Sequence, residues 1–380
     1  MTLPPRFWRN LDWALLAITF GAAGAGLVAI AGVSGTSLHA PAVRLLVIKQ
    51  LIWTVLGTGA LAACALTDYH LVERWRRELY VILLLMLGVV LVAGHHNLGS
   101  QRWIQIGPLQ VQPSEFSKLL LIFWLSAILA PKAGSLRRWE QVLLPVAGAA
   151  LAAGLVAIQP DLGTSMVFFA ILGGMLYIAG FSGARLVTVA AVGLGLIIGL
   201  VAAHLRWHQV PLPLHNYQLQ RLLAFLHPHR NAQGSGYHIV QAEMAIGSGR
   251  LTGTGLFSGG VNHQLQYLPE AQTDFIFASI ANVGGLLGAA LVLVLLAGIV
   301  WRALWCMLGA RDALGALLAG GIAVMIGFQT LLNVGVAVGL LPVTGVPLPF
   351  MSYGGSAALV DWLAVGILQS VSVRRRKIQF

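Results

Sequence analysis

Charged residues are scarce in this chain of 380 residues: 9% are Asp, Glu, Lys or Arg, and only 12 are acidic. Soluble globular domains carry about 25% charged residues, so the composition excludes an ordinary soluble domain. Hydrophobic residues reach 58%, and long apolar runs recur along the sequence. Helices satisfy their own backbone in lipid, and no alternating strand pattern is visible. The sequence therefore predicts an all-α integral membrane protein.

Cysteine is nearly absent, and this limits the chemistry available to the chain. Cys64 and Cys306 have neither a partner pattern nor metal-ligand spacing, so we interpret them as small apolar fillers. The eleven histidines show no pair with convincing ligand spacing. There is also no phosphate-binding P-loop and no nucleophile elbow around a serine.

A helix needs about 20 apolar residues to cross the hydrocarbon core, and this length predicts ten spans. We treat residues 1–380 as a single polytopic membrane domain with one large extracytoplasmic loop, 205–274, between the seventh and eighth spans. The first span follows Arg6 and Arg9 with no small-residue cleavage site, so we expect a retained signal anchor. The predicted spans lie near 13–33, 46–67, 78–95, 115–130, 141–158, 163–181, 184–204, 275–300, 313–341 and 357–373.

The net charge of +11 invites a nucleic-acid interpretation, but the positions of the basic residues favour topology. Fifteen of the 23 basic residues fall at the termini or in alternate loops, which places both termini in the cytoplasm by the positive-inside rule. We therefore expect attraction to anionic membrane lipid and no nucleic-acid partner. These residues are Arg6, Arg9, Arg74, Arg76, Arg77, Lys132, Arg137, Arg138, Arg185, Arg302, Arg311 and 374–377.

Two non-spanning segments contain distinctive patterns. Within the large loop, Tyr237 to Ile246 has helical spacing and is expected to lie on the membrane surface. Glycines between 247 and 260 permit tight turns and close backbone approach. Residues 341–356, rich in proline and glycine, predict a broken or re-entrant backbone, which membranes tolerate where it lines a cavity.

The predicted topology also places a large set of polar and ionisable side chains at the outer face. If the outer loops converge, these side chains form one polar cavity, and ionisable groups at membrane depth are functional candidates by default. The set comprises Arg102, Glu115, Lys118, Gln159, Asp161, Arg221, Arg230, Glu243, Arg250, Glu270 and Asp274.

Each of the candidates allows a functional and a structural interpretation. Asp274 is either a general base at a helix mouth or a helix N-cap beside Thr273. Glu270 is either a site carboxylate or a solvated loop charge. Arg221 is either a bidentate ligand for a pyrophosphate or a solvated surface charge.

Three further candidates lie at the ends of spans. Glu115 and Lys118 are three residues apart, so they share a helix face. They form either a simple ion pair or a lysine held for presentation to a phosphate. Asp161 follows Gln159-Pro160 and caps the next span or contributes to the cavity.

Short motifs in a fixed order extend this interpretation, and together they resemble the SEDS family (shape, elongation, division and sporulation proteins). The resemblance covers about residues 10 to 375, and its last motif looks more like the RodA branch than the FtsW branch. The motifs are QRWI at 101–104, QPSEFSK at 112–118, QPDLGT at 159–164, YQ-x-QR at 217–221, GYHI at 236–239, AIGSG at 245–249, LPEAQTDFIFA at 268–278 and LPVTGVPLPFMSYGGS at 341–356.

The resemblance implies a ten-helix SEDS bundle and a peptidoglycan glycosyltransferase that polymerises lipid II into β-1,4 glycan strands outside the cytoplasmic membrane. It implies Asp274 as the general base and Glu115 with Lys118 as the pair near the pyrophosphate. Substrate-binding roles fall on Arg102, Asp161, Gln220, Arg221 and Glu270.

The same resemblance implies a divalent cation, Mn²⁺ or Mg²⁺, with ligands that the sequence does not reveal. It also implies a class B penicillin-binding protein as partner and a role in cell elongation and shape with the elongation machinery. Two alternatives stay open: a lipid II flippase and a non-catalytic scaffold for the transpeptidase.

The sequence departs from the family pattern at a few positions. A Glu-Glu pair is frequent soon after the aspartate, where this chain has Ala281-Asn282-Val283. Arg250 stands where glycine is common, and Thr254 where lysine or histidine is common. We expect these changes to affect secondary contacts, regulation or substrate detail and to leave the reaction class unchanged.

Overall fold

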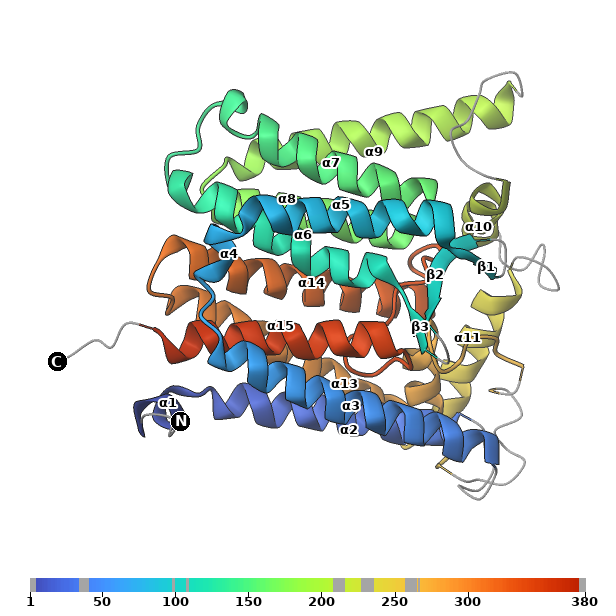
Figure 1. The fold of residues 1–380 in the computed structure, drawn as a ribbon. Helices are drawn as coiled ribbons and strands as arrows, with labels where there is room; N and C mark the ends of the chain where they lie inside the picture. Colours follow the sequence, from blue (N-terminus) through green and yellow to red (C-terminus); the bar gives the residue numbers. More distant parts are fainter. Residues whose placement is uncertain are drawn as a thin grey trace.

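The computed structural model describes residues 5–33, 41–97, 100–106, 109–207, 216–226, 236–256, 265 and 267–375. Long helices lie side by side in a bundle, with a small sheet and the helices α10 and α11 at one end (Figure 1). Helix α1 (Pro5–Asn10) and the chain termini lie at the opposite end. We name these the site end and the terminal end.

Each predicted span overlaps a helix of the bundle. Among the described residues, seven helices are long and apolar enough to cross a membrane; α7 and α8 are apolar but shorter, and α5 begins with three charged residues. The helical membrane bundle is thus confirmed, while the ten crossings stay a prediction. The helices are α2 (Trp13–Gly32), α3 (Pro41–Leu66), α5 (Arg76–Ala93), α6 (Pro113–Leu129), α7 (Leu143–Ile158), α8 (Leu162–Ile178), α9 (Gly183–Arg206), α13 (Ile276–Leu308), α14 (Ala313–Ala337) and α15 (Gly355–Val373).

The helices differ in how deeply they are buried. Most residues of α6, α14 and α15 are buried within the bundle, whereas α9 is almost entirely exposed. Helices α13 and α14 pack against each other, as do α15 and α3. Polar side chains on α6, α14 and α15 are consequently held inside the protein, where they need partners.

The terminal end carries the loops that are rich in basic residues. The short helix α4 (Leu71–Arg74), the 3₁₀ turns Ala130–Lys132 and Trp139–Gln141, and the loop between α13 and α14 lie there together with the termini (Figure 1). This shared placement agrees with the loop alternation behind the predicted topology.

A small antiparallel sheet at the site end corrects the all-α expectation. Strands β1 (His95–Asn97), β2 (Ser100–Ile106) and β3 (Leu109–Val111) pair in the order β1-β2-β3, with Ile104 opposite Val111. The strands are short and carry no apolar alternation over four to eight residues, which is the pattern that identifies strands in a sequence.

The large loop includes α10 (Asn216–Leu226) and α11 (Tyr237–Gly249). The predicted helix at 237–246 is confirmed, but it packs against α13 as well as facing outward. The Asn282 side chain donates to the Ala245 carbonyl at 3.1 Å and to Ser248 Oγ at 2.6 Å. A Cβ on Gly253, at φ +83°, would collide with the Val283 carbonyl, so this approach requires glycine. Arg230 lies outside the described residues.

Candidate active site

Asp274 lies at the site end, in the irregular segment that precedes α13. The N-cap of α13 is Phe275, so Asp274 does not occupy the N-cap position that one interpretation gave it. The Asp274 backbone carbonyl accepts from Asn333 Nδ2 at 2.8 Å. The backbone is therefore anchored while the partly buried carboxylate stays available.

The surroundings of Asp274 alter its acidity. Burial raises the pKa of Asp274 to about 6, and the nearby Glu270 carboxylate raises it further, against the opposing charges of Arg221 and Arg102. Desolvation disfavours the charged form, and a like charge does the same. A carboxyl group with a pKa near neutrality is suited to accept a proton during a reaction.

Gly345 lies beside the Asp274 carboxylate in the segment between α14 and α15. Its φ is +73°, and a Cβ at this position would lie 3.5 Å from Asp274 Oδ2 and 3.9 Å from Arg102 Nη1. Asp274 and Arg102 thus face the same small volume. This segment, 341–354, contains no regular secondary structure, as the proline and glycine pattern predicts.

Arg102 on β2 is held by the turn between α7 and α8. Its Nε donates to the Gln159 carbonyl at 3.3 Å, and its Nη2 donates to the Pro160 carbonyl. Its Nη1 lies 3.9 Å from Asp161 Oδ1. Asp161 is buried and caps α8, accepting from the Thr164 N–H at 3.1 Å and Thr164 Oγ1 at 3.0 Å. The predicted cap is confirmed, and it also orients Arg102.

Glu115 and Lys118 form a direct ion pair in the first turns of α6. Lys118 Nζ lies 2.7 Å from Glu115 Oε2, and the two side chains are only 1% and 3% exposed. A buried pair of this kind is costly to break, because the remaining partner is left as an uncompensated charge. The shared helix face predicted from the three-residue spacing is confirmed. The charges named as acting on Asp274 are those of Glu270, Arg221, Arg102 and Asp161 rather than those of Glu115 or Lys118.

The remaining candidates come from the large loop. Arg221 on α10 donates to the Val343 carbonyl at 3.5 Å, and its charge acts on Asp274. Glu270 is exposed, has a φ of +54°, and accepts from Thr273 Oγ1 at 2.8 Å. Gln220 is exposed, whereas Gln218 on the same helix is buried. The structure thus brings Arg102, Asp161, Arg221 and Glu270 around Asp274.

Sequence reasoning missed His238, in the first turn of α11. Its ring stacks on Phe275 with centroids 6.0 Å apart and an interplanar angle of 12°. Partial burial and the Arg221 charge lower the pKa of His238, while Glu270 opposes them. The histidine was visible within the GYHI motif, but its proximity to Asp274 depends on how α11 packs on α13, which no local pattern encodes.

Sequence reasoning also missed Asp361 in α15. It is a buried carboxylate within a candidate span, and its Oδ2 accepts from the Phe350 N–H at 2.8 Å. Acidic residues inside membrane spans are rare and expensive. That principle, applied to the tenth predicted span, would have identified it.

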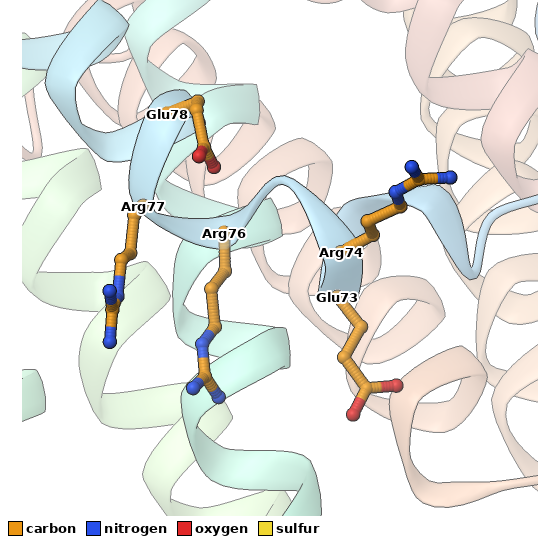
Figure 2. Close-up of a pocket in the computed structure, with 5 residues that line it drawn as sticks. All are labelled: Glu73, Arg74, Arg76, Arg77 and Glu78. Atoms are coloured by element: carbon orange, nitrogen blue, oxygen red, sulfur yellow. The ribbon is translucent and has the colours of Figure 1, made fainter.

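Two hollows on the described surface lie away from Asp274. One, of about 410 Å³ at the terminal end, is lined by Glu73, Arg74, Arg76, Arg77 and Glu78. Figure 2 shows these side chains pointing in several directions, with Arg76 and Arg77 on the same side. The other, of about 760 Å³, is an apolar groove between α13 and α14. Neither hollow contains a residue that surrounds Asp274.

Comparison with known proteins places this geometry in a family. A family model for the FtsW, RodA and SpoVE cell cycle proteins matches residues 13–377. The chain belongs to the FtsW/RodA/SpoVE family. Stage V sporulation protein E of Bacillus subtilis is 37% identical over 327 residues, covering 85% of this chain and 86% of that protein. The peptidoglycan glycosyltransferase MrdB of Escherichia coli K12 is 37% identical over 312 residues, covering 80% of each chain.

Solved structures agree with the family assignment. A chain from a structure described as a peptidoglycan synthase complex that coordinates polymerization and crosslinking matches with a TM-score of 0.79 and 27% identity, covering 96% of this chain and 98% of that one. The rod shape determining protein RodA of Thermus thermophilus matches with a TM-score of 0.70 and 25% identity, covering 97% and 98%. The FtsW/RodA/SpoVE fold therefore extends over nearly the whole chain.

Proposed function

We propose that this protein is a peptidoglycan glycosyltransferase that polymerises lipid II, with Asp274 as the general base. The observation that carries this proposal is the partly buried Asp274 carboxylate, whose pKa is raised to about 6 in a polar cluster with Arg102, Arg221 and Glu270. The family membership and the relatives named as peptidoglycan glycosyltransferases support the reaction class.

The proposed reaction joins two lipid-linked sugars. The 4-hydroxyl of the acceptor GlcNAc attacks the anomeric carbon of the donor MurNAc and gives its proton to Asp274. The bond from that carbon to the pyrophosphate oxygen breaks, and undecaprenyl pyrophosphate leaves with the electron pair. Attack opposite the leaving group converts an α-linked donor into a β-1,4 bond. Asp274 must be ionised at the start of this step, which a pKa near 6 permits at neutral pH.

The basic residues have separate tasks in this proposal. Arg102 and Arg221 approach Asp274 from β2 and α10, and a guanidinium can bind phosphate oxygens bidentately. Lys118 is held by Glu115 for the pyrophosphate, and Asp161 keeps Arg102 in place. Glu270 acts on Asp274 through its charge, and Gln220 contributes a hydrogen-bonding side chain on the exposed face of α10.

A divalent cation, Mn²⁺ or Mg²⁺, is part of the proposal as a partner of the pyrophosphate. Among the described residues, no three His, Cys, Asp or Glu side chains gather as a ready ligand set. Mg²⁺ is commonly held by one or two carboxylates together with substrate phosphates. The substrate itself would therefore supply most of the oxygens.

The biological setting is proposed from the same grounds. We place the protein in the bacterial cytoplasmic membrane with both termini in the cytoplasm and the site end outside, because the basic loops gather at the terminal end. The RodA-like motif supports a role in cell elongation and shape. A class B penicillin-binding protein would crosslink the strands, and the similarity to a chain of a peptidoglycan synthase complex supports such a partner.

A polymerisation assay tests the proposal. Purified protein, alone and with a class B penicillin-binding protein, receives lipid II with Mn²⁺ or Mg²⁺, and the glycan is separated by length. We expect ladders from the wild type and none from Asp274→Asn, which keeps the side-chain size but cannot take the proton. Glycan synthesis by folded Asp274→Asn would overturn the base assignment. Movement of labelled lipid II across liposomes without any glycan would favour the flippase alternative.

A further inference from the structure

Asp361 is a buried carboxyl group that none of the roles above uses. Its side chain lies in the second turn of α15, close to the site end, and is 5% exposed. Helix capping does not account for it, because α15 begins at Gly355 with Gly354 as its N-cap. A carboxylate placed in a span against the cost of desolvation requires a compensating role.

The first contact of Asp361 fixes a turn. Its Oδ2 accepts the Phe350 N–H at 2.8 Å, and Phe350 has a φ of +64°. The left-handed region is unfavourable for a bulky side chain, so this conformation needs support from its surroundings. An N–H donated to a carboxylate is a strong form of support. Asp361 therefore stabilises the turn at 348–353.

This turn holds the segment that carries Asp274. Ser352 Oγ donates to the Thr273 carbonyl at 2.7 Å and accepts the Leu348 N–H at 2.8 Å. The Tyr353 N–H donates to the Gln272 carbonyl at 2.8 Å. The two residues directly before Asp274 are thus fastened to the turn that Asp361 stabilises.

The second relationship of Asp361 is with the ion pair on α6. The charges of Lys118 and Glu115 both act on Asp361, and all three side chains are buried. The helices also meet where the Gln112 N–H donates to Ser356 Oγ at 3.0 Å. Lys118 Nζ lies 2.7 Å from Glu115 Oε2, and its charge also acts on Asp361 across the packed helices α6 and α15, so one cation is balanced by two acidic side chains.

We propose that Asp361 is a positioning residue that ties the Glu115–Lys118 pair to the segment carrying Asp274. It keeps the phosphate-facing cation and the base in a fixed relative placement. The proposal rests on the roles assigned to Lys118 and Asp274 under the proposed function. Its two parts are separable: a neutral amide can still accept the Phe350 N–H, whereas only a carboxylate balances Lys118.

The test compares Asp361→Asn with Asp361→Ala in the full-length protein, with Ser126→Ala as the matched control. Ser126 is a buried α6 residue whose hydroxyl donates to the Ile122 carbonyl of its own helix at 2.7 Å. Two quantities are measured: hydrogen exchange of the 348–353 amides, and polymerisation rates at several lipid II concentrations. Exchange reports the turn without any need for activity.

We expect Asp361→Ala to raise exchange in 348–353 about tenfold and to lower kcat about 100-fold, because small misplacements of a base are costly. Asp361→Asn should keep the protection and keep kcat within a few-fold. Its KM for lipid II should fall, since Lys118 is then balanced by one carboxylate and attracts the pyrophosphate more strongly. Ser126→Ala should match the wild type in both measurements.

The outcomes separate this proposal from the proposed function. Wild-type exchange and kcat in Asp361→Ala would overturn the positioning role, and so would an Asp361→Asn variant as damaged as Asp361→Ala. If Asp361→Ala does not fold, Ser352→Ala cuts the next contact and should reproduce the raised exchange; normal exchange there would overturn the proposal. If the wild-type protein makes no glycan, the proposed polymerase function is refuted. The hydrogen-exchange data still decide whether Asp361 stabilises the turn at 348–353.

Discussion

The side-chain amide of Asn333 in α14 joins the two segments that meet at the candidate base: its Nδ2 donates to the Asp274 carbonyl at 2.8 Å and to the Val346 carbonyl at 2.9 Å. Asn333 is buried. A single amide on a central helix therefore sets the position of Asp274 relative to the segment that contains Gly345.

Replacement of Asn333 by Leu should lower activity more than stability. The substitution leaves two carbonyls without their donor, which costs about 1–3 kcal/mol, and it releases the Asp274 backbone, where a shift of about 1 Å can cost 100-fold in rate. We expect kcat to fall by about 10- to 100-fold in the polymerisation assay. Thr330→Val is the control, because Thr330 Oγ1 donates to the Ile326 carbonyl within α14 itself. Equal losses in both variants would contradict the anchoring role.

Asp274 and Asn333 differ in how far the sequence reveals them. Asp274 stands where a polar segment becomes a long apolar span, and this local pattern identifies it as a candidate. Asn333 lies in an apolar helix, and its role depends on α14 passing beside a segment 59 residues away in sequence. The place of His238 near Asp274 and the clustering of Arg102 with Asp274 could not be predicted for the same reason, because tertiary packing decides which loops meet.

The helices themselves follow from apolar length, so each predicted span overlaps a helix of the structure. Caps at Asp12, Asp161 and Asp312 mark helix starts with the residue type that favours them. The strands at 95–111 were not predicted: β1 and β3 have only three residues each, and the seven residues of β2, SQRWIQI, do not alternate strictly between apolar and polar.

The pH dependence of polymerisation should report the environment of Asp274. The base must be ionised, so the rate should rise with pH through about 6, the raised pKa of Asp274. Because Glu270 contributes to raising that pKa, Glu270→Gln should move this limb of the profile to lower pH. The control is Glu140→Gln, an exposed carboxylate at the terminal end. A limb that does not move in Glu270→Gln would contradict the proposed coupling.

The Glu115–Lys118 pair offers a test between a structural ion pair and a phosphate-binding lysine. Glu115→Gln should destabilise the protein by up to about 3–5 kcal/mol, because buried Lys118 loses the one carboxylate with which it makes direct contact among the described residues. The apolar double variant Glu115→Leu with Lys118→Met should recover most of that loss, as buried pairs replaced by apolar groups often do. We expect the double variant to melt near the wild type yet make no glycan. Normal glycan synthesis by it would show that the pair is only structural.

Thr254 and Asn282, two positions where the sequence is expected to depart from the family pattern, are in contact. Thr254 Oγ1 lies 3.2 Å from both the carbonyl and the Oδ1 of Asn282. Asn282→Glu alone should be destabilising, since the new carboxylate is buried and unpaired. Adding Thr254→Lys should recover stability by supplying its partner, whereas Asn282→Glu with Thr188→Lys, on exposed α9, should not. Melting temperatures measure this, and equal values for the two double variants would contradict a direct pairing.

At the terminal end, His70 lies between two carboxylates, with Nδ1 2.7 Å from Asp68 Oδ1 and Nε2 3.0 Å from Asp312 Oδ2. Partial burial lowers the pKa of His70, but hydrogen bonds and charges from Asp68 and Asp312 outweigh it and raise the pKa above 6.5. A histidine whose pKa is higher in the folded than in the unfolded protein stabilises the fold at pH values below its unfolded-state pKa. This stabilisation is lost as pH rises through its folded-state pKa. Burial raises the pKa values of Asp68 and Asp312, but hydrogen bonds outweigh it and lower both, led by the His70 N–H for Asp68 and the Gly315 N–H for Asp312. The stability that these carboxylates contribute is therefore lost only as pH falls through their folded pKa values.

Relative to His70→Gln, which cannot carry the charge, the melting temperature of the wild type should therefore decrease as pH rises past the ordinary histidine pKa of about 6.5. The difference should be small, because half-exposed ion pairs contribute about 0–1 kcal/mol. If the melting temperatures of the wild type and His70→Gln change in parallel with pH, a charged His70 does not stabilise the contact between α4 and the start of α14. If the wild type instead gains stability relative to His70→Gln as pH rises, the sign is opposite to that of a raised His70 pKa, and the raised pKa is contradicted.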